Sequence, residues 1–148
     1  MDKSIREKII RAALVIVIMN LCSCDKELPK IQNPFENKDG NLILYVSNQS
    51  YETKIVDILV TIDDTPTLHE YFKVANQHLW KQFSLQLSQG RHKIKAVTWK
   101  GNAVIEQEFE LNGKRWAVLN FCYGKQEGHM CNKPSFLFEV FDKPIRFL

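Results

Sequence analysis

The sequence predicts an all-β fold, an antiparallel β-sandwich of about eight strands. Three observations lead to this prediction. Apolar and polar residues alternate with a period of two in several short runs. Turn-forming residues separate these runs about every ten residues, which is typical of sandwiches and barrels. No stretch after residue 23 has apolar residues at helical spacing over three turns.

The strands of the first half follow from apolar runs that end in turn residues. The clearest run is 56–62, where Val and Ile at the even positions alternate with Asp57, Leu59 and Thr61. Asp63-Asp64-Thr65-Pro66 then supplies turn chemistry and ends the run. The expected strands of this half are 42–46, 56–62, 68–75 and 83–87.

The strands of the second half are longer. Residues 116–123 have apolar side chains on both faces, which indicates a strand in the middle of its sheet or one covered on its second face. Asn112-Gly113 is a candidate turn between this strand and the one before it. The expected strands of this half are 91–99, 103–111, 116–123 and 135–141.

The turn at Gly101-Asn102 predicts the register of one hairpin. A two-residue loop with Gly at its first position suits a type II′ turn, because Gly adopts positive φ readily. In that register Lys95 faces Glu108 and Lys93 faces Glu110 on one face. Ile94 faces Phe109 and Thr98 faces Ile105 on the other face. Charge and apolar patterns therefore agree with the turn chemistry.

The expected number and spacing of strands resemble those of immunoglobulin-like domains. The resemblance is architectural and implies no functional residue. Cys122 and Cys131 are much closer in sequence than the cysteines of the antibody-type domains.

The N-terminus has the layout of an export signal. Lys3, Arg6, Lys8 and Arg11 precede an apolar run from Ala12 to Leu21. This run of about ten residues is shorter than the 18 or more that a membrane-spanning helix needs. It is the one helical candidate in the sequence. We expect a signal peptide at residues 1–23.

Leu21-Cys22-Ser23-Cys24 resembles the lipobox of bacterial lipoproteins, with an aliphatic residue three before the cysteine and a small one just before it. The resemblance implies diacylglycerol and palmitate on Cys24, cleavage after Ser23 and a lipid anchor in the cell envelope. The alternatives are an ordinary secretory signal and an uncleaved anchor. Asp25-Lys26-Glu27 is compatible with either the inner or the outer membrane.

The remaining chain divides into a polar segment and one domain. Residues 24–40 contain two prolines and few apolar groups, and predict a flexible tether. Residues 41–148 are the expected sandwich. The chain has 20 Lys and Arg residues, four of them within 1–23, and 17 Asp and Glu residues, two of them within 1–23. The net charge of residues 24–148 is therefore about +1. This near-neutral balance gives no sign of a nucleic-acid partner.

Cys122 and Cys131 remain after Cys22 is removed and Cys24 is lipidated. They flank a loop with two glycines, and an exported protein can form disulfides, so we expect a bridge between them. Two alternatives stay open: free thiols, or a metal site formed by Cys122, His129, Met130 and Cys131.

No motif of a known enzyme class or cofactor occurs, and we expect neither catalysis nor a cofactor. His69, His78, His92 and His129 are scattered. Asp57, Asp63 and Asp64 do not have the spacing of a calcium loop. Glu106, Glu108 and Glu110 share a strand face whose expected lysine partners indicate a solvated row rather than an acid–base pair.

The tryptophans are the remaining candidates for recognition. Trp99 lies on the charged face of the expected hairpin, and Trp80 follows a polar stretch. The alternative for all three tryptophans, Trp116 included, is packing in the core or at a strand edge. The sequence therefore predicts a lipid-anchored, non-enzymatic module of the cell envelope that binds an unidentified envelope protein or glycan. The alternative function is a carbohydrate-binding accessory lipoprotein, with Trp99 as the principal contact.

Overall fold

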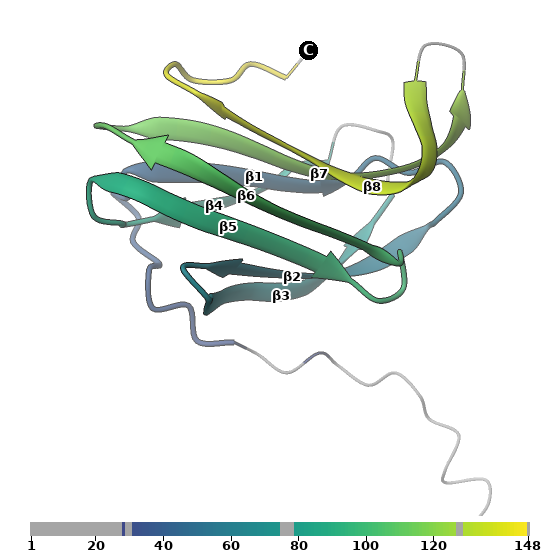
Figure 1. Ribbon diagram of the computed structural model, residues 1–148, viewed down its shortest axis with the longest axis horizontal. Coiled ribbons are helices and arrows are strands. Elements are labelled where there is room, and N and C mark those ends of the chain that lie inside the picture. Colours follow the sequence, from purple (N-terminus) through teal and green to yellow (C-terminus); the bar gives the residue numbers. More distant parts are fainter. Residues whose placement is uncertain (1–27, 29–30, 75–78, 127–128, 148) are drawn as a thin grey trace, which may run out of the picture.

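The computed structural model describes residues 28, 31–74, 79–126 and 129–147, so the signal peptide and Cys24 lie outside the described residues. The described chain forms eight strands and no helix, which confirms the predicted all-β sandwich (Figure 1). The strands are β1 (Leu42–Asn48), β2 (Ile55–Ile62), β3 (Thr65–Lys73), β4 (Lys81–Leu85), β5 (Gly90–Thr98), β6 (Ala103–Leu111), β7 (Arg115–Gln126) and β8 (His129–Phe141).

The strands form two four-stranded sheets that pack face to face. Sheet 1 has the order β4-β1-β7-β8 and sheet 2 has the order β3-β2-β5-β6. Edge strands β6 and β8 lie against each other on one side of the sandwich, and β3 and β4 lie on the other side. The even-numbered apolar residues of β2 and β5 face inward, as the alternation predicted. The largest fully buried side chains include Phe121, Leu42, Leu44, Ile58, Ile62, Leu85 and Ile94.

Two connections differ from the expected antiparallel order. β1 pairs with β7 in parallel, with Leu42 opposite Arg115. The expected hairpin at Asn112-Gly113 is wrong, because β6 belongs to sheet 2 and β7 to sheet 1. Gly113 has a φ of 73° and turns the chain from one sheet to the other. As the apolar pattern of 116–123 indicated, β7 is central, between β1 and β8.

The pairing of β5 with β6 is confirmed, but the predicted register is wrong by two residues. Lys95 lies opposite Glu106, not Glu108, and Lys93 lies opposite Glu108, not Glu110. Ile94 lies opposite Gln107 and Ala96 opposite Ile105, although Ile94 and Phe109 are both buried as expected. The loop has four residues, 99–102, and the positive φ belongs to Asn102 rather than Gly101.

Gly101 is required for space instead of for its φ angle. A Cβ atom there would lie 2.7 Å from the ring of Phe121 and from the Thr98 methyl group. A shift of two residues keeps every side chain on its face. The charge and apolar patterns therefore fit both registers, and only the packing of the turn distinguishes them.

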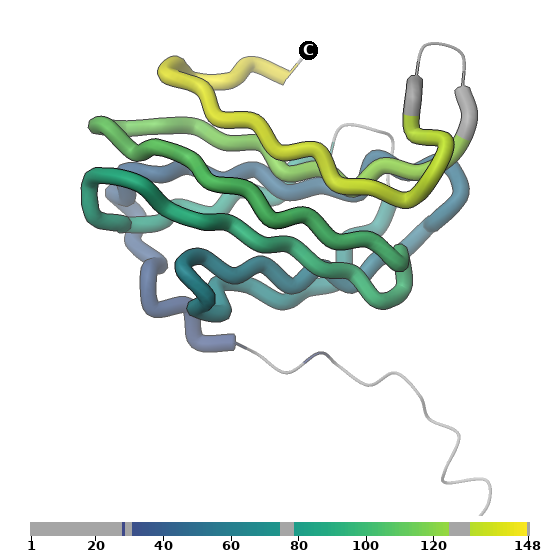
Figure 2. The backbone as a smooth tube through the Cα atoms, in the orientation of Figure 1, coloured from purple at the N-terminus to yellow at the C-terminus, as the bar shows by residue number. Residues whose placement is uncertain are grey.

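Part of the segment assigned to the tether lies against the domain. Glu36 forms a β-bridge with Leu85, the Asn37 N–H donates to the Ser84 carbonyl (3.0 Å), and the Gln86 N–H donates to the Phe35 carbonyl (2.7 Å). Phe35 packs against the core. Residues 31–40 run down the side of the sandwich formed by β3 and β4 (Figure 2). The apolar side chain of Phe35 and the open edge of β4 thus both contact this polar stretch.

Candidate functional site

Trp99 lies in a turn that polar contacts hold in one conformation. The carboxylate of Asp57 is buried in β2 and accepts hydrogen bonds from the Thr98 hydroxyl (3.1 Å) and the Lys100 N–H (2.8 Å). The Gly101 N–H donates to the Thr98 hydroxyl (3.0 Å). These bonds satisfy the buried carboxylate and fix the backbone of the turn. The Trp99 side chain extends outward and is 61% exposed.

An apolar row crosses sheet 2 next to Trp99. His69, Leu59, Val97 and Val104 lie opposite one another on β3, β2, β5 and β6, all on the outer face. Val104 is 63% exposed and Tyr71, two residues along β3 from His69, is 40% exposed. We call the set Leu59, His69, Tyr71, Val97, Trp99 and Val104 the outer patch. A contiguous apolar surface of this kind marks an interaction site more often than scattered exposed residues do.

Ring contacts give the outer patch a defined shape. The ring centroids of His69 and Trp99 are 5.8 Å apart. The ammonium group of Lys100 lies 4.3 Å from the centroid of Tyr71, so one face of that ring is already in contact with a cation. Trp99 is therefore the aromatic ring of the patch with the most surface left for a partner.

A charged region lies beside the outer patch on the same face of sheet 2. Lys93 contacts Asp64 (3.1 Å) and Glu106 (3.8 Å), Lys95 contacts Glu106 (3.9 Å), and Arg91 contacts Glu108 (3.6 Å). The hydrogen bond and charge of Asp64, followed by the charge of Glu106, raise the pKa of Lys93. Glu106 and Glu108 therefore have cationic neighbours, as expected for a solvated row, but the predicted pairs Lys95–Glu108 and Lys93–Glu110 are wrong.

The buried side chain of His92 lies at the end of the charged region, beside Asp63. His92 lies with Nδ1 2.7 Å from the Asp63 carboxylate and Nε2 3.0 Å from the Ser88 carbonyl. Both acceptors need an N–H, so the charged imidazolium fits this position. Burial opposes the charge, but the hydrogen bonds to Asp63 and Ser88 and the charges of Asp63 and Glu110 outweigh it and raise the pKa of His92.

Trp80 is not part of the outer patch. Its ring stacks on Phe147 with a centroid distance of 4.6 Å, and Phe147 also contacts Tyr45 at 4.9 Å. These residues lie at the outer face of sheet 1, where the C-terminal segment covers part of the surface. Trp80 and Trp99, the two tryptophans that the sequence suggested for binding, therefore belong to different sheets, and only Trp99 lies in an open apolar surface.

The cysteine pair forms the predicted disulfide. Cys122 on β7 and Cys131 on β8 are bonded, with Cα atoms 5.8 Å apart, within the range that a disulfide allows. This bond excludes the free-thiol alternative in the structure and removes both thiolates from the alternative metal site. No group of three or more His, Cys, Asp or Glu side chains suited to a metal ion occurs in the part of the chain described.

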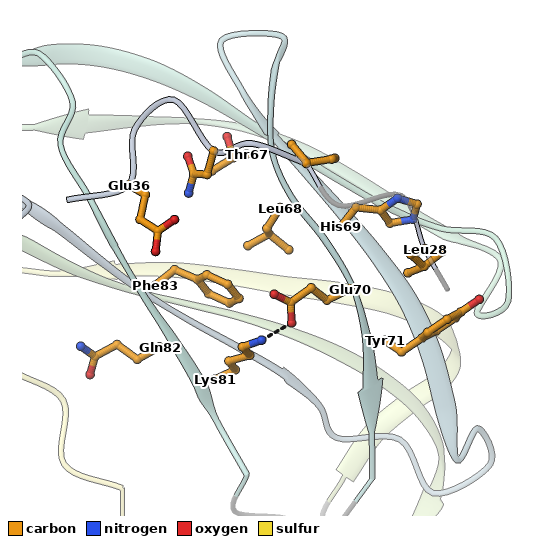
Figure 3. A pocket seen from close by; sticks show the side chains of 12 residues that line it. Leu28, Glu36, Thr67, Leu68, His69, Glu70, Tyr71, Lys81, Gln82 and Phe83 are labelled. Atoms are coloured by element: carbon orange, nitrogen blue, oxygen red, sulfur yellow. Dashed lines mark hydrogen bonds and ion pairs between the residues drawn. The ribbon is translucent and has the colours of Figure 1, made fainter. Parts of the chain in front are cut away.

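A groove separates the β3 and β4 edges of the two sheets. It has a volume of about 640 Å³, and Leu28 and Ile31 of the N-terminal segment line it together with strand residues (Figure 3). Glu70 of β3 and Lys81 of β4 form an ion pair between the two sheets. His69 and Tyr71 line both the groove and the outer patch, so the two features meet along β3.

Comparisons do not add a relative. No protein-family model, curated protein or solved structure matches the chain. Among the described residues, no helix is long and apolar enough to cross a membrane.

Sequence reasoning identified Trp99 but not the row beside it. Val104 shares its strand face with Glu106, Glu108 and Glu110, and the predicted register does not place it opposite Val97, where the structure has it. Leu59, on the polar face of the best alternating strand, was the available sign that this face is partly apolar.

Proposed function

We propose that this protein is a lipid-anchored component of the bacterial envelope that binds another envelope protein through the outer patch of sheet 2. The observation that carries the proposal is the apolar row of Leu59, Val97 and Val104 across β2, β5 and β6, which His69 extends onto β3, with the exposed Trp99 beside it. The Leu-Cys-Ser-Cys sequence supports the anchor at Cys24. A diacylglyceryl cysteine carries two acyl chains, which is enough for stable attachment to a membrane.

The chemistry of the patch favours a protein over a glycan. Leu59, Val97 and Val104 of the row are aliphatic, and within the patch His69 and Tyr71 carry the groups that could bond sugar hydroxyls. The other polar side chains of this face lie in the charged region, where they pair with one another. A flat apolar surface with one large aromatic ring is typical of the centre of a protein interface. The exposed ring of Trp99 is the feature that keeps glycan stacking as the second candidate.

The binding proposal is tested by cross-linking in cells. A photo-reactive amino acid at Val104 should give a discrete adduct with one envelope protein. The same group at Leu137, which is 52% exposed on β8 of sheet 1, should not give that adduct. With the partner identified, Trp99→Ala should weaken its binding about ten- to a hundredfold, as expected for a central interface residue. Lys95→Ala in the charged region is the matched control and should have little effect.

Two results would overturn the binding proposal. One is an adduct pattern that is the same from Val104 and Leu137. The other is binding of purified envelope glycan that Trp99→Ala abolishes, with no protein adduct, which would establish the glycan alternative. The anchor is tested separately: Cys24→Ala should abolish incorporation of radiolabelled palmitate, and retention of the label would contradict lipidation at this residue.

A further inference from the structure

The N-terminal segment joins the sandwich at one particular side. Residues 35–37 bond to β4 and to Gln86 just after it, and Gly40 lies so close to Leu85 that a Cβ atom would be 2.3 Å from the Leu85 carbonyl oxygen. Upstream of this contact, Ile31 and Leu28 line the groove between β3 and β4 (Figure 3). The chain therefore leaves the domain on the β3–β4 side and not at an end of the strands.

The length of chain that remains is short. Cys24 precedes Leu28 by four residues, which can span at most about 14 Å when fully extended. A free tether over residues 24–40 could span about 55 Å by the same measure and would let the domain turn in any direction. The contacts of Leu28 and of residues 31–40 with the domain remove most of that freedom, because the free connection to the lipid then begins at Leu28.

The opposite side of the sandwich is out of reach of this connection. Edge strands β6 and β8 are three strand spacings from β3 and β4, or about 14 Å, and the side chains of both edges add to that distance. For the β6–β8 side to touch the membrane, Leu28 would have to stand above the lipid by more than the extended length of the residues that connect it to Cys24.

We infer that the anchored protein stands on its β3–β4 side, with the groove facing the lipid bilayer and the strands lying along the membrane. The inference rests on the proposed lipid anchor and adds the orientation in which the anchor holds the domain. The outer patch is on the face of sheet 2 next to this side, so it points sideways, close to the membrane. Its partner should therefore be a protein held at the surface of the same membrane.

The orientation can be measured by contact quenching on vesicles. The full chain, lipidated in bacteria, is placed in phosphatidylcholine–phosphatidylglycerol vesicles that contain a lipid with a nitroxide on its headgroup. Fluorescent labels are attached to single cysteines at exposed positions, Lys73→Cys on β3 and Gln82→Cys on β4 for the near side. Glu108→Cys on β6 and Glu139→Cys on β8 report the far side. The native disulfide and the acylated Cys24 do not react with the label.

Quenching should be severalfold stronger at the two near-side labels than at the two far-side labels. Equal quenching at all four positions, or stronger quenching at Glu108→Cys and Glu139→Cys, would overturn the orientation. A matched variant with a Gly/Ser linker of about 20 residues between Lys26 and Glu27, spanning about 25 Å on average, should lose the asymmetry. Asymmetry that persists with the linker would overturn the argument from tether length.

A second form of the protein, attached to the membrane without the lipid anchor, tests the orientation independently of lipidation at Cys24. Residues 1–24 are replaced by a polyhistidine tag joined to Asp25, and the chain is bound to a nickel-chelating lipid. If the natural chain stays off membranes but the tagged chain shows the asymmetry, the proposed anchor is wrong and the orientation holds. If the natural chain is membrane-bound and shows no asymmetry, the anchor holds and the orientation is wrong.

Discussion

Aromatic side chains lie outside the shared core at both sheets, but Trp80 and Tyr45 at sheet 1 contact the C-terminal segment, whereas Trp99 at sheet 2 is largely exposed. Residues 33–40 occupy the edge of sheet 1 at β4, and Phe147 near the C-terminus packs on Trp80 and Tyr45 at its outer face. On sheet 2, Trp99 and Val104 remain largely exposed. Exposure of a tryptophan thus depends on where the terminal segments pass.

The difference indicates how the two sheets divide their roles. Burial of aromatic surface in sheet 1 adds to the stability of the fold. The turn that carries Trp99 is held by the buried Asp57 carboxylate, so sheet 2 can present an open ring without depending on that ring for stability. Substitutions in the covered regions should therefore destabilise the domain more than substitutions in the outer patch.

The largest effect is expected where the N-terminal segment meets β4. Gly40→Ala places a Cβ atom against the backbone of Leu85, which cannot move without breaking the pairing of β4 with β1. We expect a loss of about 3 kcal/mol or more, measured by urea unfolding. Gly113→Ala is the control: its site is open, so the positive φ alone should cost about 1–2 kcal/mol. A smaller cost for Gly40→Ala than for Gly113→Ala would contradict the close contact.

An intermediate effect is expected from the two tryptophans. Trp80→Ala removes the stacking on Phe147 and should cost about 1–2 kcal/mol in the free energy of unfolding. Trp99→Ala, in the open patch, should change stability by only about 0.5 kcal/mol. A double-mutant cycle of Trp80→Ala and Phe147→Ala should give a coupling of about 0.5–1.5 kcal/mol. Equal destabilisation by the two Trp→Ala changes would show that the sheets do not differ in this way.

The smallest effect is the pH dependence of the contact between His92 and Asp63 at the charged end of sheet 2. The pKa of His92 is raised above its ordinary value of 6.5, so its contribution to stability is complete below that pH and is lost as pH rises through the folded-state pKa. Burial opposes the charge of Asp63, but the Lys93 N–H, His92 and the charge of Lys93 together lower the pKa of Asp63 below 3.8. Its contribution is therefore present above pH 3.8 and is lost as pH falls through the lower folded-state value.

Unfolding measured between about pH 4 and pH 8 tests the assignment for His92. The wild-type protein should lose stability as pH rises beyond 6.5, whereas His92→Gln should show a flatter profile over that interval. The same slope in both proteins would mean that another group titrates there. Sheet 1 variants such as Trp80→Ala should keep the wild-type dependence of stability on pH, since they leave the His92–Asp63 contact intact.

Several features followed from the sequence alone because they depend on neighbouring residues. Alternation at 56–62 determined which side chains of β2 face the core, and the two-sided apolar run at 116–123 indicated a central strand. Their spacing and the expected export predicted a disulfide between Cys122 and Cys131, and the structure contains it. Each of these inferences needed only the period of a strand or the chemistry of a short loop.

Tertiary structure decided what depends on distant residues. A period of two cannot separate registers that differ by two, so the packing of Gly101 beneath Phe121 set the pairing of β5 with β6. The polar composition of residues 31–40 gave no sign of their contact with β4, which relies on backbone hydrogen bonds and on the close approach of Gly40 to Leu85. The outer patch likewise exists only because four strands from separate parts of the chain bring Leu59, Val97 and Val104 into one row beside Trp99.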